Sequence, residues 1–221
     1  YQVEGFQWLN TLCDKGFGGI LADEMGLGKS VQLIALLLSR YQRNTGEMGD
    51  GSLGPSLIVC PASLVYNWGA EFTKFAPSFN AVVVAGTKAE RRTAIGRAFR
   101  ADEPTVLITS YDLLRRDVDD YTANEQRFNV MALDEAQYIK NHTTKIAKAV
   151  KAVAADHRFA LTGTPIENRL SELWSIFDFL MPGLLGSYKR FHERYELPIS
   201  NARAADGSTA EGRAAAQVNP E

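Results

Sequence analysis

Six short apolar runs, each followed by a turn or a helical pattern, constrain the fold of this chain more than any other feature. They are residues 18–23, 56–61, 80–86, 105–110, 130–136 and 159–165. Most are continuously apolar rather than alternating, which is typical of strands in a parallel sheet covered on both faces. Helical patterns separate several of them, at residues 31–42, 88–100 and 145–155. The alternation predicts an α/β fold in which βαβ units build a doubly wound, mainly parallel sheet flanked by helices.

The polar motifs of the chain begin where these predicted strands end. They occupy residues 23–30, 134–137 and 162–168. Ligands of doubly wound sheets bind at the carboxyl ends of the strands. We therefore expect one site at that edge, assembled from segments that are far apart in the sequence.

Composition limits the class of protein. A length of 221 residues with 45% hydrophobic residues fits one α/β domain, or one lobe of a larger enzyme. Cys13 and Cys60 are the only cysteines and form no zinc pattern or disulfide framework, which favours a reducing, intracellular compartment. No signal peptide or membrane span is evident, so we expect no membrane partner. With a net charge of −2, a nucleic-acid partner would have to be held by a local groove.

Residues 19–30, GILADEMGLGKS, end like a phosphate-binding loop. In that reading Gly26 and Gly28 let the backbone curl around a phosphate, Lys29 supplies charge and Ser30 offers a hydroxyl to Mg²⁺. The usual pattern G-x-x-x-x-G-K-[ST] has a glycine where this chain has Asp23. The alternative is a strand, turn and helix in which the glycines serve only the turn.

Two further motifs follow strands. VMALDEAQ, residues 130–137, ends an apolar run with Asp134 and Glu135, which suit a Mg²⁺ ligand and a residue that orients the attacking water. ALTGTPIEN, residues 160–168, offers two hydroxyls around a glycine. The alternatives are a strand that reaches solvent and a simple polar turn.

The end of the chain differs from the rest. A helix that is stopped by Pro182-Gly183 has one apolar stripe of Leu170, Leu173, Trp174, Phe177 and Leu180. The remaining sequence is first basic and aromatic, then small, polar and rich in alanine. We predict one domain over residues 1–182 and the start of a helical insertion or linker over residues 183–221.

In order along the chain, six segments closely resemble the successive motifs of the Swi/Snf-type ATPases, which are DNA translocases of the DEAD/DEAH helicase superfamily. The segments are residues 1–9, 18–30, 57–68, 106–117, 133–141 and 161–186. In this family the phosphate loop has aspartate in place of the first glycine, so Asp23 is expected. Ser30 stands where threonine is common and Gln137 where histidine is common, and the DEAQ form resembles bacterial members.

The resemblance implies a fold and a chemistry. The fold is the first RecA-like lobe of a two-lobe core, and the cofactors are ATP and Mg²⁺. Gln2 matches the residue that recognises adenine. Lys29, Asp134 and Glu135 match catalytic residues, and Ser30 and Asp134 match Mg²⁺ ligands. The expected nucleotide-binding loop consists of Asp23, Glu24, Met25, Gly26, Leu27, Gly28, Lys29 and Ser30.

The same resemblance implies contacts with DNA. Gln137, Thr162, Gly163 and Thr164 match positions that couple the nucleotide state to DNA. Family members touch the phosphates of one DNA strand at positions that match Ser63, Asn67, Ser110 and Tyr111, whereas we expect Trp68 in the core. Backbone N–H groups and hydroxyls suffice for such contacts.

The implied activity is a double-stranded-DNA-dependent ATPase that translocates on duplex DNA and remodels protein–DNA complexes. Its expected partners are duplex DNA, a second RecA-like lobe of the same full-length chain and a DNA-bound protein that it displaces. Since no second lobe is recognisable after residue 182, we expect this lobe alone to be nearly inactive. We expect a cytoplasmic protein, nucleoid-associated in a bacterium or nuclear in a eukaryote. The alternatives are a strand-separating DNA or RNA helicase lobe and a nucleotide-binding scaffold without hydrolysis.

Overall fold

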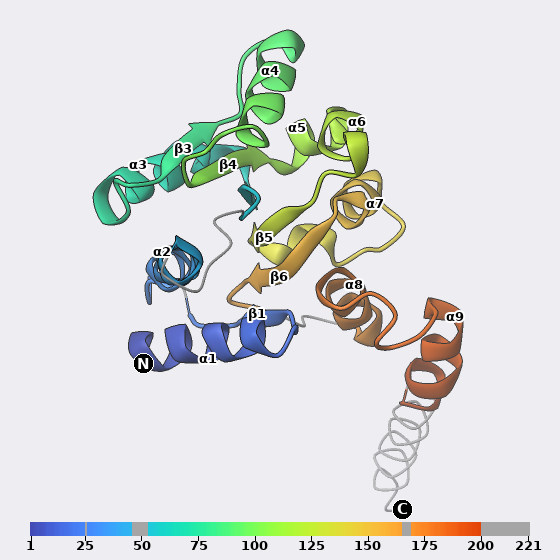
Figure 1. Cartoon of the computed structure of the whole chain (residues 1–221). Coiled ribbons are helices and arrows are strands. Elements are labelled where there is room, and N and C mark those ends of the chain that lie inside the picture. Colours follow the sequence, from blue (N-terminus) through green and yellow to red (C-terminus); the bar gives the residue numbers. More distant parts are fainter. Residues whose placement is uncertain (25, 46–52, 165–168, 200–221) are drawn as a thin grey trace, which may run out of the picture.

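All six predicted strands form, and they pair into one sheet (Figure 1). The computed structural model describes residues 1–24, 26–45, 53–164 and 169–199. The strands are β1 (Gly19–Leu21), β2 (Ser56–Cys60), β3 (Asn80–Val83), β4 (Thr105–Ser110), β5 (Phe128–Asp134) and β6 (Ala155–Leu161). Every pair is parallel, in the order β1-β6-β5-β2-β4-β3. The predicted α/β fold with a parallel sheet is confirmed.

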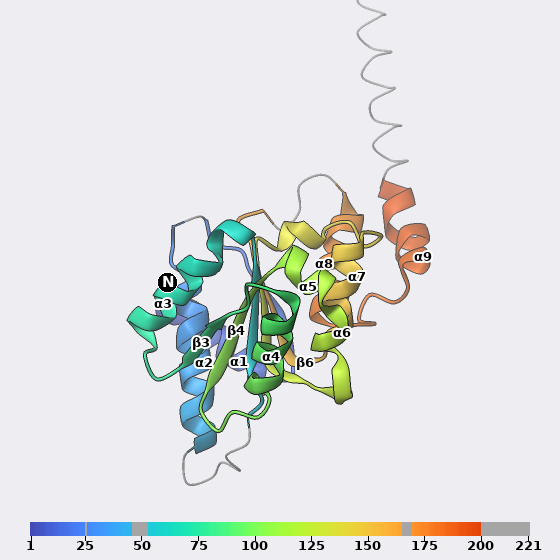
Figure 2. The same ribbon diagram turned by 90° about the horizontal axis from the view of Figure 1, so that it is seen from above.

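Helices cover both faces of the sheet (Figure 2). The α-helices are α1 (Gln2–Asp14), α2 (Lys29–Thr45), α3 (Val65–Phe75), α4 (Lys88–Ala98), α5 (Tyr111–Arg116), α6 (Val118–Tyr121), α7 (Lys145–Ala152), α8 (Leu170–Leu180) and α9 (Tyr188–Phe191). Three short 3₁₀ helices are η1 (Ala62–Leu64), η2 (Ala123–Glu125) and η3 (Ala136–Ile139), and η4 (His192–Glu196) is a π-helix. Helices α1, α2 and α3 pack on one face, whereas α4 to α8 pack on the other.

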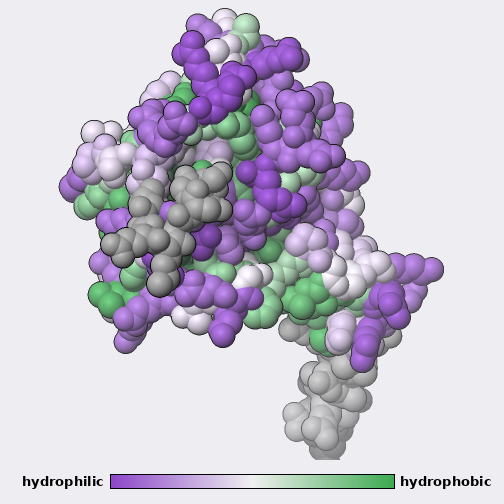
Figure 3. All heavy atoms as spheres, in the orientation of Figure 1, coloured by the Kyte–Doolittle hydropathy of each residue, from purple (hydrophilic) through white to green (hydrophobic). Residues whose placement is uncertain are grey.

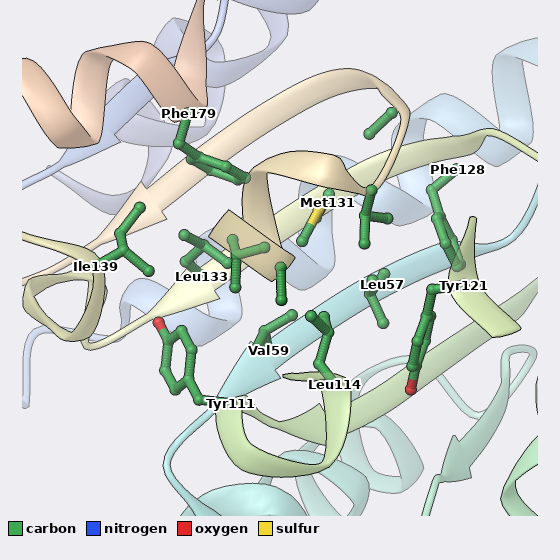
Figure 4. Close-up of a cluster of buried hydrophobic side chains, with 14 of the residues drawn as sticks. Leu57, Val59, Tyr111, Leu114, Tyr121, Phe128, Met131, Leu133, Ile139 and Phe179 are labelled. Carbon is green, nitrogen blue, oxygen red and sulfur yellow. The ribbon is translucent and has the colours of Figure 1, made fainter. Parts of the chain in front are cut away.

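The core is divided between these two faces because successive strand residues point to opposite sides. In β2, Leu57 and Val59 pack toward the α4 to α8 side, whereas Ile58 and Cys60 pack toward α1 to α3. Figure 4 shows part of the first cluster, in which strand residues meet Leu114 of α5 and other helical side chains. The central strands are buried on both faces, which explains their continuously apolar sequence.

Two local predictions were wrong. Residues 145–155 were expected to be helical throughout, but α7 ends at Ala152 and β6 already begins at Ala155. The first half of β6 is polar because its side chains are partly exposed, and Arg158 uses its guanidinium to donate to the Phe179 and Val153 carbonyls. These polar residues conceal the strand in the sequence.

The second error concerns the apolar stripe of α8. Trp174 and Leu180 are buried as expected, but Leu170, Leu173 and Phe177 are only half-buried. Ile176 and Phe179 are buried in their place, because this side of the helix packs against the sheet and α7.

The chain continues beyond the sheet through a turn at Met181–Leu184 into α9 and η4. The division between residues 1–182 and 183–221 stays a prediction, since residues 200–221 lie outside the described part. No helix in the described ranges is long and apolar enough to cross a membrane. On the face seen in Figure 3, hydrophilic residues predominate and hydrophobic ones gather in small groups.

Candidate functional site

The three predicted motifs meet at the carboxyl edge of the sheet. The loop after β1 leads into α2, Asp134 ends β5, and Thr162 follows β6. A cavity of about 570 Å³ lies between the loop and α3. Its lining includes Lys29, Ser30, Asp134 and Glu135.

Lys29 is held by the loop that precedes it. Its Nζ donates to the carbonyl oxygen of Asp23 at 2.6 Å and to that of Glu24 at 3.0 Å. Both acceptors are neutral backbone groups, and no carboxylate among the described residues forms an ion pair with this ammonium. The charge therefore stays available to an anion in the cavity.

Asp23, the residue in place of the usual glycine, has a structural partner. Gln32 on α2 donates its side-chain amide to the Asp23 carboxylate at 2.9 Å. This bond ties the start of the loop to the helix that the loop introduces. Met25, another expected loop residue, lies outside the described residues.

Gln2 lies directly against the loop. Its side-chain amide donates to the Leu27 carbonyl at 3.3 Å. The next residue, Gly28, has φ of +74°, and a Cβ at this position would overlap the Gln2 amide. A glycine is therefore required at position 28, both for its left-handed backbone and for the close approach of Gln2.

Asp134 is fixed by three contacts. The indole N–H of Trp68 donates to its Oδ2 at 2.9 Å, the Glu135 N–H donates to its Oδ1 at 3.0 Å, and the Tyr111 hydroxyl donates to its backbone carbonyl at 2.7 Å. Burial raises the pKa of Asp134, while the Trp68 hydrogen bond opposes this rise and the charge of Glu135 adds to it. The chain thus orients this carboxylate but compensates its charge incompletely.

Glu135 connects the end of β5 to the third motif, which follows β6. Its backbone is left-handed, with φ of 52°, a conformation that costs a non-glycine residue free energy and is often found at functional sites. The Gln137 amide donates to the Glu135 carboxylate at 2.6 Å, and the Thr162 hydroxyl donates to the Gln137 amide oxygen at 2.9 Å. The Thr164 N–H in turn donates to the Thr162 hydroxyl at 3.1 Å.

These residues form a continuous bridge from β5 to the loop after β6. We refer to Glu135, Gln137, Thr162 and Thr164 as the β5–β6 bridge. Gly163 lies within it and is exposed. The bridge thus connects Glu135 through Gln137 to a surface loop.

The residues of the cavity fit a magnesium nucleotide. Gly26 and Gly28, both with positive φ, shape the loop that precedes the N-terminus of α2, where N–H groups favour an anion. Ser30 and Asp134 are oxygen donors of the kind that Mg²⁺ prefers, and both line the cavity. Bound there, the cation would compensate the negative charge of the Asp134 carboxylate.

The comparison with family models decides the family. A model of the SNF2-related domain matches residues 1–216. The chain belongs to the SNF2-related domain family. The predicted resemblance to Swi/Snf-type ATPases and the RecA-like fold are thereby confirmed.

Relatives of this SNF2-related chain come from yeast, bacteria and archaea. The TATA-binding protein-associated factor MOT1 of Saccharomyces cerevisiae is 44% identical over 220 residues, covering 97% of this chain. The putative ATP-dependent helicase/translocase YwqA of Bacillus subtilis is 42% identical over 205 residues, covering 92% of this chain. The chain spans only 12% and 21% of the lengths of these two proteins.

A solved structure is also similar. The Sulfolobus solfataricus SWI2/SNF2 ATPase core in complex with dsDNA matches with a TM-score of 0.77 and 40% identity. The match covers 91% of this chain and 39% of that one.

Two of the expected DNA-contact residues have side chains that the SNF2-related fold buries. The side chain of Ser110 is buried and accepts a hydrogen bond from the Leu113 N–H at the start of α5. Tyr111 is 2% exposed and its hydroxyl is bonded to Asp134. Both side chains thus have partners within the fold. The DNA contacts expected at these two positions stay predictions, since backbone N–H groups can also bind phosphates. Ser63 and Asn67 are exposed and remain proposed contacts.

Other residues of the site were missed or only half understood. Trp68 is buried as expected, but it also positions Asp134. Gly5 allows α1 to approach α2, because a Cβ there would overlap the Gln32 side chain. Glu71 of α3 lines the cavity. The three-residue spacing of Trp68 and Glu71 indicates that they share one face of a helix. Nothing in the sequence shows that this face is turned toward β5.

Proposed function

We propose that this chain is the ATP- and Mg²⁺-binding first lobe of a double-stranded-DNA-dependent ATPase that translocates on duplex DNA and remodels protein–DNA complexes. One observation carries the proposal: the phosphate loop, Asp134 and Glu135 line one cavity, and the β5–β6 bridge leads from that cavity to the surface. In this reading Lys29 binds the outer phosphates, Ser30 and Asp134 hold Mg²⁺, and Glu135 orients the attacking water.

The proposed partners are duplex DNA, a second RecA-like lobe and a DNA-bound protein. Support for duplex DNA comes from the similar archaeal core, whose structure is a complex with dsDNA. Exposed Asn67 lines the cavity in the first turn of α3, and exposed Ser63 lies in η1 just before that helix. They offer an amide and a hydroxyl to a phosphate backbone. The overall charge of −2 requires such contacts to be local.

The test compares three activities of the full-length protein. ATP hydrolysis is measured with duplex DNA and with single-stranded DNA of the same length. Translocation is measured as ATP-dependent displacement of a third strand from a DNA triplex, and unwinding as separation of the duplex itself. We expect duplex-stimulated hydrolysis and triplex displacement with an intact duplex, and the Lys29→Ala variant should show neither.

The alternatives give different results. A strand-separating helicase would separate the duplex and respond best to the strand on which it moves. A nucleotide-binding scaffold would bind ATP and hydrolyse none of it with either DNA. Either outcome would contradict the proposal.

A further inference from the structure

Glu71 lines the nucleotide cavity, and its carboxylate is poorly satisfied by the rest of the described structure. Its Oε2 is buried and has no hydrogen-bond partner among the described residues. Its Oε1 has only a 3.5 Å contact with the side-chain amide of Asn67. The cavity that Glu71 lines is the one that contains Ser30 and Asp134. Because buried acceptors are nearly always paired, this oxygen indicates a missing donor.

Glu71 lies on the same face of α3 as Trp68, the residue that contacts Asp134. Residues three apart lie on the same face of a helix, so Glu71 shares a face with Trp68. The indole of Trp68 reaches the Asp134 carboxylate at 2.9 Å. Glu71 is therefore placed one turn along α3, on the side of the cavity where Asp134 stands.

The nearest basic residue on α3 does not satisfy Glu71. Lys74 lines the same cavity three residues further along the helix. Its Nζ lies 4.8 Å from the centre of the Phe75 ring, and no ion pair joins it to Glu71 in the described structure. The ammonium of Lys29, also in the lining, donates to the carbonyls of its own loop instead. A donor for the Glu71 carboxylate would therefore have to enter the cavity.

Water bound to a divalent cation has the required chemistry. Mg²⁺ usually keeps several of its waters in nucleotide sites, and each is a strong donor to a carboxylate. Second-sphere carboxylates of this kind orient the ligands of a metal. We propose that Glu71 is a positioning residue for the divalent cation of the nucleotide, its carboxylate accepting a hydrogen bond from a water in the coordination shell. This inference rests on the proposed function, since it needs a metal nucleotide in the cavity.

The test uses Mn²⁺ as a paramagnetic probe for Mg²⁺. Free Mn²⁺ is titrated by electron paramagnetic resonance into the ADP complex of the full-length protein, and ADP affinity is measured separately in the presence of a chelator. Glu71→Gln keeps the shape of the side chain and removes its charge. The control is Glu103→Gln, the same change at an exposed position before β4, at the opposite edge of the sheet.

We expect Glu71→Gln to weaken Mn²⁺ binding by about tenfold, as for other second-sphere partners, and to leave metal-free ADP affinity unchanged. Glu103→Gln should change neither. The melting temperature of Glu71→Gln without ligand should not fall, because the replacement breaks no ion pair in the described structure. The rise in melting temperature caused by Mn²⁺ and ADP together should be smaller than in the wild type.

Three outcomes would overturn the inference. These are unchanged Mn²⁺ affinity, equal losses of Mn²⁺ and metal-free ADP affinity, and a lower melting temperature without ligand, which would indicate a structural role. If the wild-type protein bound no nucleotide in any condition, the proposed function would fail as well. Failure of the inference alone leaves wild-type binding intact.

Discussion

Lys29 and Glu135 line the same cavity, but the structure predicts different effects of changing them. Lys29→Ala should lose nucleotide binding, because it removes a charge-assisted contact worth roughly 1.5–3 kcal/mol. Glu135→Gln should retain binding and abolish turnover, since the amide keeps the shape of the side chain but cannot act as a carboxylate toward water. Fluorescent-ATP titration and phosphate release by the full-length protein measure the two effects. Equal loss of affinity in both variants would refute this division of roles.

Gln2 is expected to read the base of the nucleotide. Its amide already contacts the loop through the Leu27 carbonyl, so it lies where a loop-bound nucleotide would extend. A site that hydrogen-bonds adenine leaves polar groups unpaired when guanine is offered. The full-length protein should therefore prefer ATP to GTP in competition binding, and Gln2→Ala should reduce this preference. A wild-type protein that ignores the base would contradict the role of Gln2.

Some residues of the cavity could be predicted from the sequence, whereas others could not. Asp134 and Glu135 follow an unmistakable apolar strand, and Lys29 lies in a recognisable loop, so their meeting at one cavity could be predicted. The hydrogen bond from Trp68 to Asp134 joins residues 66 positions apart and depends on how α3 packs. The burial of Tyr111 likewise depends on tertiary packing and could not be predicted from its motif alone.

At the scale of elements, α9 is attached through an aromatic cluster that includes a histidine. The His142 ring lies 5.3 Å from the Trp174 ring of α8 and 4.2 Å from the Tyr188 ring of α9, measured between centroids. Burial, and then the positive charge of Lys151, lower the pKa of His142. Lys148 acts in the same direction, whereas Asp178 and Glu196 oppose it. The folded state therefore disfavours the protonated ring.

The sign of the pH effect follows. An unfolded histidine titrates near pH 6.5, above the folded value, so the unfolded chain binds the proton first as the pH falls. The contribution of His142 to stability is complete above about pH 6.5 and is lost as the pH falls from there through the folded pKa. His142→Phe keeps a ring but cannot be protonated. The wild type should lose more melting temperature than this variant between about pH 7.5 and pH 5.5.

The comparison isolates one histidine. Burial also lowers the pKa of His157, but this residue is present in both proteins and its effect cancels in the difference. Identical losses in wild type and variant would show that His142 does not contribute to the pH dependence.

Elements were predicted well where their sequence pattern matched their burial. The five residues of β2 are all buried and read as one apolar run. The start of β6 was missed because a strand with exposed, charged side chains does not differ from the end of a lysine- and alanine-rich helix. The alanines favour a helix locally, and pairing with β5, where Ala155 lies opposite Phe128, overrides that preference.

At the scale of the whole molecule, the order of the strands creates the site. β6 lies between β1 and β5, so the loop after β6 lies next to both the phosphate loop and the two acidic residues. Local periodicity carries no information about this order, although the rule that ligands bind at the carboxyl edge predicted the side correctly. The Gln137–Thr162 contact follows from the adjacency of β5 and β6 rather than from either motif alone.

The lining of the cavity limits what the 221-residue chain can do alone. It includes a lysine and two acids of the proposed machinery, but no arginine among the described residues. In phosphate-transferring enzymes an arginine that stabilises the transition state contributes about 10³–10⁵ in rate. The isolated chain should therefore bind Mg²⁺-ATP weakly and hydrolyse it near background, with or without duplex DNA. Phosphate release beside a binding titration tests this expectation. DNA-stimulated turnover by this chain would show that it needs no second lobe.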